Sequence, residues 1–118
     1  MTAPNSIRRF EYRPCRIAAG FEIDFVSEGE TFRGVCRDVS DAGIRAAFAG
    51  SVTVGRCGLL ILRHPAGALE LQAQVAYIEK EQVGLVFLFK SPWERAMTIE
   101  YMTAITNYAA ASLVVRFP

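Results

Sequence analysis

The chain has 118 residues, of which 52% are hydrophobic, and this length and composition suit one domain around a single apolar core. A formal net charge of +1 gives no overall indication of a nucleic-acid or membrane-surface partner. The N-terminus lacks the apolar stretch of a signal peptide, and no run approaches the ~18 apolar residues of a membrane span. We therefore expect a soluble, cytoplasmic protein without membrane insertion.

The cysteine and histidine content argues against a disulfide scaffold and against a zinc site. The cysteines, Cys15, Cys36 and Cys57, form no C-x-x-C pair, and their odd number does not suit a secreted disulfide framework. The single histidine, His64, lies in a Pro-Gly turn, where we expect it to be exposed. We expect three buried thiols that act as small apolar residues, with no metal and no other cofactor.

Alternation of apolar and polar residues predicts three strands in the first half of the chain. Every odd-numbered residue from Cys15 to Phe25 is apolar, which indicates a long half-buried strand. A turn at residues 27–30 leads to a second strand, and a short loop leads to a third. Their apolar positions are Phe32, Gly34 and Cys36, and then Ile44, Ala46 and Phe48.

Three further strands are predicted after a loop at residues 50–55. The run Cys57–Leu62 is continuously apolar, which is typical of a strand buried on both faces. Apolar residues then alternate with polar ones from Leu69 to Tyr77 in a fifth strand. Val83, Leu85, Phe87 and Phe89 are the apolar positions of the sixth strand.

The periodicity changes at Ser91, where a helix is expected to begin. Ser91 suits the N-cap, Pro92 the first helical position and Glu94 a capping box. Apolar residues then recur at steps of three and four, and we expect the helix to end at about Ala111. The apolar stripe consists of Trp93, Met97, Tyr101, Ala104, Ile105 and Tyr108. Residues 113–118 are interpreted as a tail, either strand-like or a docking segment.

Six short strands followed by one helix predict a mainly β fold. We expect a six-stranded antiparallel β-barrel with a C-terminal amphipathic α-helix that covers an open side of the barrel. The predicted organisation is a flexible N-terminal tail over residues 1–7, one domain over residues 8–112 and a C-terminal tail over residues 113–118.

Positive charge is concentrated just before the first predicted strand. Between Arg8 and Arg16 there are four arginines and one acidic residue, Glu11. Pro14 follows Arg13 directly and tethers the cluster close to the barrel. Guanidinium groups fork two donors onto a phosphate or a guanine and also stack on bases. The cluster therefore predicts a specific anion site.

The connection between the second and third strands carries more functional groups than a turn needs. It offers carboxylates at Asp38 and Asp41, a hydroxyl at Ser40 and a glycine at Gly43. Asp38 can accept from the N1 and N2 donors of a guanine, and Ser40 can donate to a phosphate or a base acceptor. Gly43 lets the backbone approach closely. A ligand with guanine edges and phosphates would suit both this loop and the arginines.

Catalysis is not expected. His64 has no patterned partner, Ser40 has neither an elbow motif nor a paired base, and no Gly-rich phosphate loop is present. Asp38 and Asp41 have the residue type of an acid–base pair, but loop aspartates more often accept from backbone N–H groups. An enzyme such as a hydrolase is the least favoured interpretation.

Together the two motifs resemble a known family. Arg9-x-x-x-Arg13, followed about one hairpin later by Asp38-x-Ser40-x-x-Gly43, resembles the two-part signature of PilZ domains. The proline after the second arginine, the long first strand, the six strands and the C-terminal helix are also similar to that family. The resemblance covers residues 8–111, and no signature position is substituted.

The resemblance implies a receptor for cyclic di-GMP, a bacterial second messenger. Arg9 and Arg13 would contact guanine and phosphate, and the loop would hold a guanine. Arg8 resembles the arrangement in members that bind a stacked pair of ligand molecules. The implied ligand-binding residues are Arg8, Arg9, Arg13, Asp38, Ser40 and Gly43. Arg37 and Arg45 flank the loop, either as further contacts or as strand-surface residues.

The expected mechanism is closure of the arginine segment onto the barrel when ligand binds. Closure would change the surface offered to an effector protein or to a second copy, so a protein partner and a homodimer both fit. Two alternatives stay open: a PilZ-like protein-interaction adaptor that binds no nucleotide, and a small barrel that binds single-stranded nucleic acid. The latter needs basic and aromatic residues along one strand face, whereas the predicted faces are mostly acidic or neutral.

Overall fold

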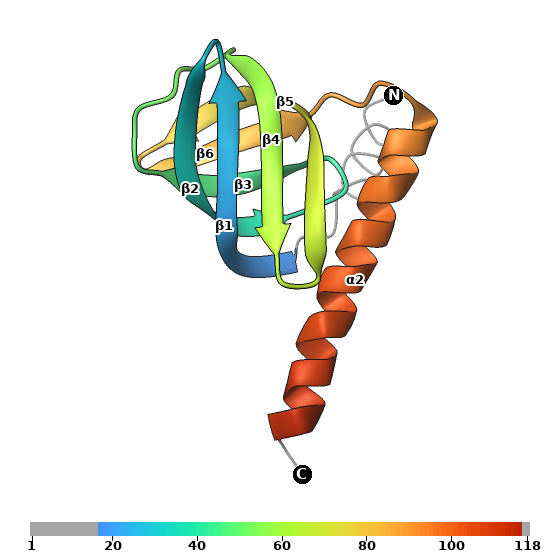
Figure 1. The fold of residues 1–118 in the computed structure, drawn as a ribbon. Coiled ribbons are helices and arrows are strands. Elements are labelled where there is room, and N and C mark those ends of the chain that lie inside the picture. The colour runs from blue at the N-terminus through green and yellow to red at the C-terminus, as the bar shows by residue number, and fades with distance from the viewer. Residues whose placement is uncertain (1–16, 117–118) are drawn as a thin grey trace, which may run out of the picture.

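The computed structural model describes the backbone of residues 17–116 and the side chains of residues 20–108. It contains six strands and one helix in chain order (Figure 1). The elements are β1 (Ile17–Ser27), β2 (Glu30–Val39), β3 (Gly43–Phe48), β4 (Cys57–His64), β5 (Gly67–Glu79), β6 (Gln82–Phe87) and α2 (Pro92–Arg116).

The strands form a closed barrel in the order β1-β2-β3-β6-β5-β4, and every neighbouring pair is antiparallel. The predicted six-stranded antiparallel barrel with a C-terminal helix is therefore confirmed. The barrel has no open side for the helix to cover, because closure pairs both edges of the sheet. In this respect the prediction was wrong: α2 stands beside a finished barrel, and its C-terminal half extends past it (Figure 1).

The barrel core follows the predicted alternation on most strands. The inward residues of β1 are Phe21, Ile23 and Phe25, each at most 6% exposed. The other strands contribute Cys36, Val39, Ile44, Ala46, Leu60, Leu62, Leu69, Leu71, Ala73, Val75, Val83, Leu85 and Phe87. The prediction that β4 is buried on both faces is wrong, since Leu59 and Ile61 are only half-buried. One face of β4 lines the core and the other lies on the outside of the barrel.

The cysteines and the histidine differ from their predicted environments. Cys36 is buried as expected, but Cys57 is exposed at the start of β4, and Cys15 lies outside the described residues. His64 is half-buried rather than exposed, because its ring packs edge-on against Phe21 and Tyr108, with centroids 5.0 Å and 5.2 Å away. Burial lowers the pKa of His64.

Helix α2 begins as predicted and ends later. Glu94 N donates to Ser91 Oγ at 3.3 Å, and Glu94 Oε1 accepts from Lys90 N at 2.8 Å, which satisfies the first turn. The expected end at about Ala111 is wrong: the helix continues to Arg116, since no glycine or proline interrupts residues 112–116. Most of the segment predicted to be a tail is therefore helical.

Only part of the predicted apolar stripe of α2 is buried. Tyr101 and Ile105 face the barrel together with Thr98, whereas Trp93 is 73% exposed. The Tyr101 hydroxyl accepts from His64 N at 3.3 Å and donates to the carbonyl of Gly67 at 2.9 Å, which anchors the helix to the β4–β5 turn. A closed barrel offers the helix only a narrow strip of outer wall, so Trp93 and Met97 stay largely in solvent.

Candidate ligand-binding site

A β-bulge at the end of β2 turns Asp38 to the outside of the barrel. Cys36 is fully buried, so strict alternation would also point Asp38 inward. The register shifts between Cys36 and Asp38, and the extra residue there is Arg37. As a result Arg37 and Asp38 both lie on the outer side of the barrel. A β-bulge commonly changes the direction of side chains in this way.

Asp38 is held in place by Arg45 of β3. Nε and Nη2 of Arg45 lie 2.8 Å and 2.7 Å from the same oxygen, Oδ2 of Asp38. The side chain of Asp38 is 13% exposed and that of Arg45 is 37% exposed, so the pair is shielded on the carboxylate side and open on the cation side. The hydrogen bond and the charge of Asp38 raise the pKa of Arg45. The sequence left two possibilities for Arg45, a ligand contact or a strand-surface residue. The structure places it in a cluster with Asp38.

Ser40 organises the turn from inside. It is 1% exposed, and its Oγ accepts from the backbone N–H groups of Ala42 and Gly43 at 3.1 Å and 3.2 Å. The Ser40 hydroxyl also approaches the Gly43 carbonyl at 3.3 Å, and Ser40 N donates to that carbonyl at 2.9 Å. The side chain therefore satisfies the turn itself, as serines in tight turns commonly do. These bonds fix the shape of the backbone around Ser40.

Gly43 is needed because β3 and β6 approach very closely there. A Cβ on Gly43 would overlap the carbonyl oxygen of Leu85, the neighbouring backbone on β6. The glycine is required here by the pairing of β3 with β6, which differs from the close turn that the sequence suggested. Ser40 and Gly43 together hold the loop that carries Asp38 against the barrel.

A second bulge places Tyr77 on the same outer face. The register of β5 shifts between Val75 and Tyr77, so Tyr77 is 38% exposed although sequence alternation put it in the buried row. Its ring occupies the space above Gly84 that a Cβ would need. Tyr77 also makes a minor contribution to the raised pKa of Arg45. An aromatic ring therefore lies beside the Asp38–Arg45 pair.

The alternation of β5 places Tyr77 in the buried row, so its place on the surface was not predicted. The signal that could have found it is the run Val75-Ala76-Tyr77-Ile78, which breaks the polar alternation kept by Glu70, Gln72 and Gln74. Such a break is typical of an extra residue in a strand.

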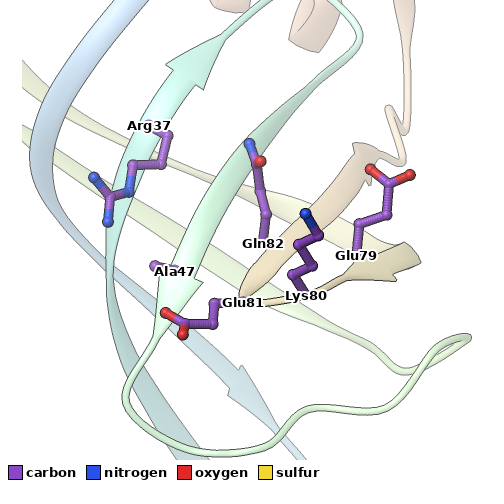
Figure 2. A pocket seen from close by; sticks show the side chains of 6 residues that line it. All are labelled: Arg37, Ala47, Glu79, Lys80, Glu81 and Gln82. Atoms are coloured by element: carbon purple, nitrogen blue, oxygen red, sulfur yellow. The ribbon is translucent and has the colours of Figure 1, made fainter.

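An open hollow of about 760 Å³ adjoins this cluster. It is lined by Arg37, Ala47 and the β5–β6 turn residues 79–82 (Figure 2). Ala47, which lies two residues after Arg45 on β3, contributes a small side chain to this lining. Figure 2 shows Gln82, Lys80 and Glu79 to the right of the Arg37 side chain, and the Glu81 carboxylate below Ala47.

The second aspartate of the loop has a different partner. Asp41 Oδ2 lies 3.3 Å from Nη2 of Arg95 in the first turns of α2. The adjacent carbonyl of Ala42 accepts from Phe87 N at 2.9 Å. Asp38 and Asp41 thus pair with different arginines, Arg45 and Arg95. The loop is attached both to the end of β6 and to the helix.

The structure brings together three of the six sequence-predicted ligand residues. Asp38 near the end of β2, Ser40 in the connection and Gly43 at the start of β3 lie close together where these two strands meet. The predicted connection over residues 38–43 is shorter than expected, because Asp38 and Gly43 belong to the strands. Arg8, Arg9 and Arg13 lie outside the described residues. No described helix is both long and apolar enough to span a membrane.

Comparison with known proteins identifies this architecture. A family model described as PilZ domain matches residues 7–104. The PilZ domain of YcgR from Escherichia coli, solved with c-di-GMP, is similar in structure with a TM-score of 0.72 and 17% identity, covering 86% of this chain and 95% of that one. A search of curated proteins found no match.

Two further solved structures have the same fold. The PilZ domain of CeSA from a cellulose-synthesizing bacterium has a TM-score of 0.66 and 12% identity, covering 78% of this chain and 98% of that chain. The Bacillus subtilis inhibitor of motility MotI/DgrA has a TM-score of 0.64 and 20% identity, covering 83% of this chain and 51% of that protein.

Proposed function

The chain belongs to the PilZ domain family, and from this premise we propose that it is a receptor for cyclic di-GMP that signals by changing shape rather than by catalysis. This proposal rests on the arrangement of residues 38–45, where β2 meets β3. Arg45 orients the carboxylate of Asp38, while Ser40 and Gly43 fix the conformation of the backbone. The solved structure of the YcgR PilZ domain with c-di-GMP supports the choice of ligand.

The cluster suits a purine dinucleotide in three respects. A carboxylate held by Arg45 accepts from the N1 and N2 donors of guanine. The partly exposed guanidinium of Arg45 remains available to an anion on its solvent side, because Asp38 occupies only part of its donor fork. The ring of Tyr77 offers a face on which a base stacks. Guanine edges, phosphate charge and base faces are the three features that cyclic di-GMP presents together.

Arg8, Arg9 and Arg13 complete the proposed site from the segment before β1. Each charge-assisted contact contributes about 1.5–3 kcal/mol, whereas ordering the backbone costs about 1–2 kcal/mol per residue. Several arginines must therefore bind together for closure to be favourable. The closed segment would present a different surface to an effector protein, in a cytoplasmic setting where the second messenger is made.

Isothermal titration with cyclic di-GMP tests this function. The wild-type protein is expected to bind, and Arg9→Ala or Arg13→Ala to abolish measurable heat while circular dichroism stays unchanged. Arg33→Ala is the matched control, since Arg33 is an 84% exposed arginine whose recorded ion pair, with Asp24, is long at 3.9 Å. Absence of wild-type binding, or wild-type affinity in both arginine variants, would refute the proposal. A parallel titration with single-stranded oligonucleotides separates it from general nucleic-acid binding.

A further inference from the structure

The β2–β3 loop, residues 40–42, contacts both ends of the connection that leads from β6 to α2. The carbonyl of Ala42 accepts from Phe87 N at 2.9 Å, where β6 ends. Asp41 Oδ2 lies 3.3 Å from Nη2 of Arg95, in the first turns of α2. The connection, residues 88–91, therefore lies between two attachments to the same loop. A shift of the loop acts directly on the beginning of the helix.

Ser40 links this loop to the residues of the proposed ligand site. Its Oγ accepts from the N–H groups of Ala42 and Gly43 at 3.1 Å and 3.2 Å, and its own N–H donates to the Gly43 carbonyl at 2.9 Å. These bonds close the loop around Asp41, so its backbone has a fixed place between β2 and β3. Asp38 comes just before this loop in the chain. The position of Asp41 is thus tied to the backbone that is proposed to hold the ligand.

The helix alone does not account for an arginine at position 95. The beginning of a helix is the positive end of its dipole, where anions are stabilising and cations are not. The Arg95 side chain is half exposed, so it gains little from burial. The neighbouring Glu94 caps the helix by accepting from Lys90 N at 2.8 Å. The stabilising partner of Arg95 is therefore the carboxylate of Asp41 on the loop.

We infer that Arg95 is a positioning residue for the proposed ligand site. Through Asp41 it holds the β2–β3 loop in the conformation that binds, and it couples ligand binding to the first turns of α2. This inference rests on the proposed function. Coupling of this kind is reciprocal, because a contact that raises the affinity for a ligand is itself strengthened when the ligand binds. Cyclic di-GMP should therefore reduce local opening of the first turns of α2.

The expected coupling is small and local. The side chains of Arg95 and Asp41 are 52% and 36% exposed, and exposed ion pairs change an equilibrium by about two- to fivefold. A second anchor of α2 does not involve the loop: the Tyr101 hydroxyl accepts from His64 N and donates to the carbonyl of Gly67. The helix therefore stays attached to the barrel when the ion pair is removed, and only its first turns loosen.

Isothermal titration with cyclic di-GMP tests the positioning role. Arg95→Gln should raise the dissociation constant about two- to fivefold, and Arg95→Lys, which keeps the charge, should recover part of the loss. The same substitution in an Asp41→Asn background should have no further effect, whereas direct attraction between Arg95 and the ligand would persist there. Lys90→Gln is the matched control, because it removes an exposed positive charge close to α2 whose side chain makes no ion pair among residues 20–108.

Amide hydrogen exchange with and without saturating cyclic di-GMP tests the coupling to α2. In the wild-type protein the ligand should slow exchange at residues 96–99 about two- to fivefold, and in Arg95→Gln this protection should disappear. Residues 102–108, beyond the Tyr101 anchor, serve as the internal reference.

Three results would each overturn the inference: wild-type affinity in Arg95→Gln, an equal loss in the Asp41→Asn background, or equal protection in both proteins. Absence of wild-type binding is a distinct result, because it would overturn the proposed function and this inference with it.

Discussion

The ring of Tyr77 fills the space directly above Gly84, where any Cβ would collide with it. A glycine on β6 therefore lets an aromatic side chain of β5 lie against the outer wall of the barrel. Together with the bulge after Val75, it decides that Tyr77 faces solvent beside Arg45 and does not enter the core.

Tyr77→Ala should weaken cyclic di-GMP binding if the ring stacks on a base. Stacking on an aromatic side chain is worth about 1–3 kcal/mol per base, so the dissociation constant should rise about five- to 150-fold. Tyr77→Phe keeps the ring and should bind within about threefold of wild type on the same reasoning. Isothermal titration measures both, and equal losses in the two variants would show that the hydroxyl matters rather than the ring.

Asp38→Ala should reduce the preference for guanine more than it reduces the attraction for phosphate. In the proposed site the carboxylate would accept from the N–H donors of guanine, whereas the cationic groups, Arg45 among them, would bind any cyclic dinucleotide. In competition binding, the ratio of the affinities for cyclic di-GMP and cyclic di-AMP should be smaller in Asp38→Ala than in the wild-type protein. An unchanged preference for guanine in the variant would mean that Asp38 serves only to position Arg45.

Gly43→Ala should destabilise the fold, because its Cβ would press on the Leu85 carbonyl where β3 meets β6. Overpacking of this kind typically costs about 1–3 kcal/mol in the free energy of unfolding. Gly20→Ala is the control, since Gly20 has nothing within 4 Å of its would-be Cβ. Chemical denaturation of both variants measures the difference, and equal stability would contradict the close approach.

The thiols of Cys36 and Cys57 should differ sharply in reactivity. Burial, with the charge of Asp38, raises the pKa of Cys36 to about 12, so almost no thiolate is present near neutral pH. Cys57 is exposed. Brief alkylation at pH 8 followed by peptide mass spectrometry should label Cys57 and leave Cys36 intact. Labelling of Cys36 without denaturant would show that β2 opens locally.

The stability of the protein should fall as the pH drops below the ordinary pKa of histidine, about 6.5. Burial lowers the pKa of His64, so the unfolded chain takes up a proton before the folded one does, and acid favours unfolding. The contribution is fully present above pH 6.5 and is lost below it. His64→Phe keeps a ring between Phe21 and Tyr108 and should flatten this part of the pH profile in thermal unfolding. If the substitution leaves the pH profile unchanged, the loss of stability in acid arises from other titratable groups.

Much of the fold follows directly from the order of residues. Period-two alternation located the strands, because a strand that lines a core must present every second side chain to it. Ser91, Pro92 and Glu94 located the start of α2, because they satisfy the free N–H groups of a first turn. The spacing of Asp38, Ser40 and Gly43 predicted a binding role for the connection between β2 and β3, and this role stays a prediction.

What the sequence could not decide depends on contacts between distant strands. Alternation would have pointed both Asp38 and Tyr77 into the core, and two bulges reversed them. A bulge exists only relative to a paired strand, so its position follows from cross-barrel register and not from the residues of one strand. Closure of the barrel likewise left α2 with a narrow contact and kept Trp93 in solvent. The chain alone specified which residues alternate, and the three-dimensional pairing determined which of them reach the surface.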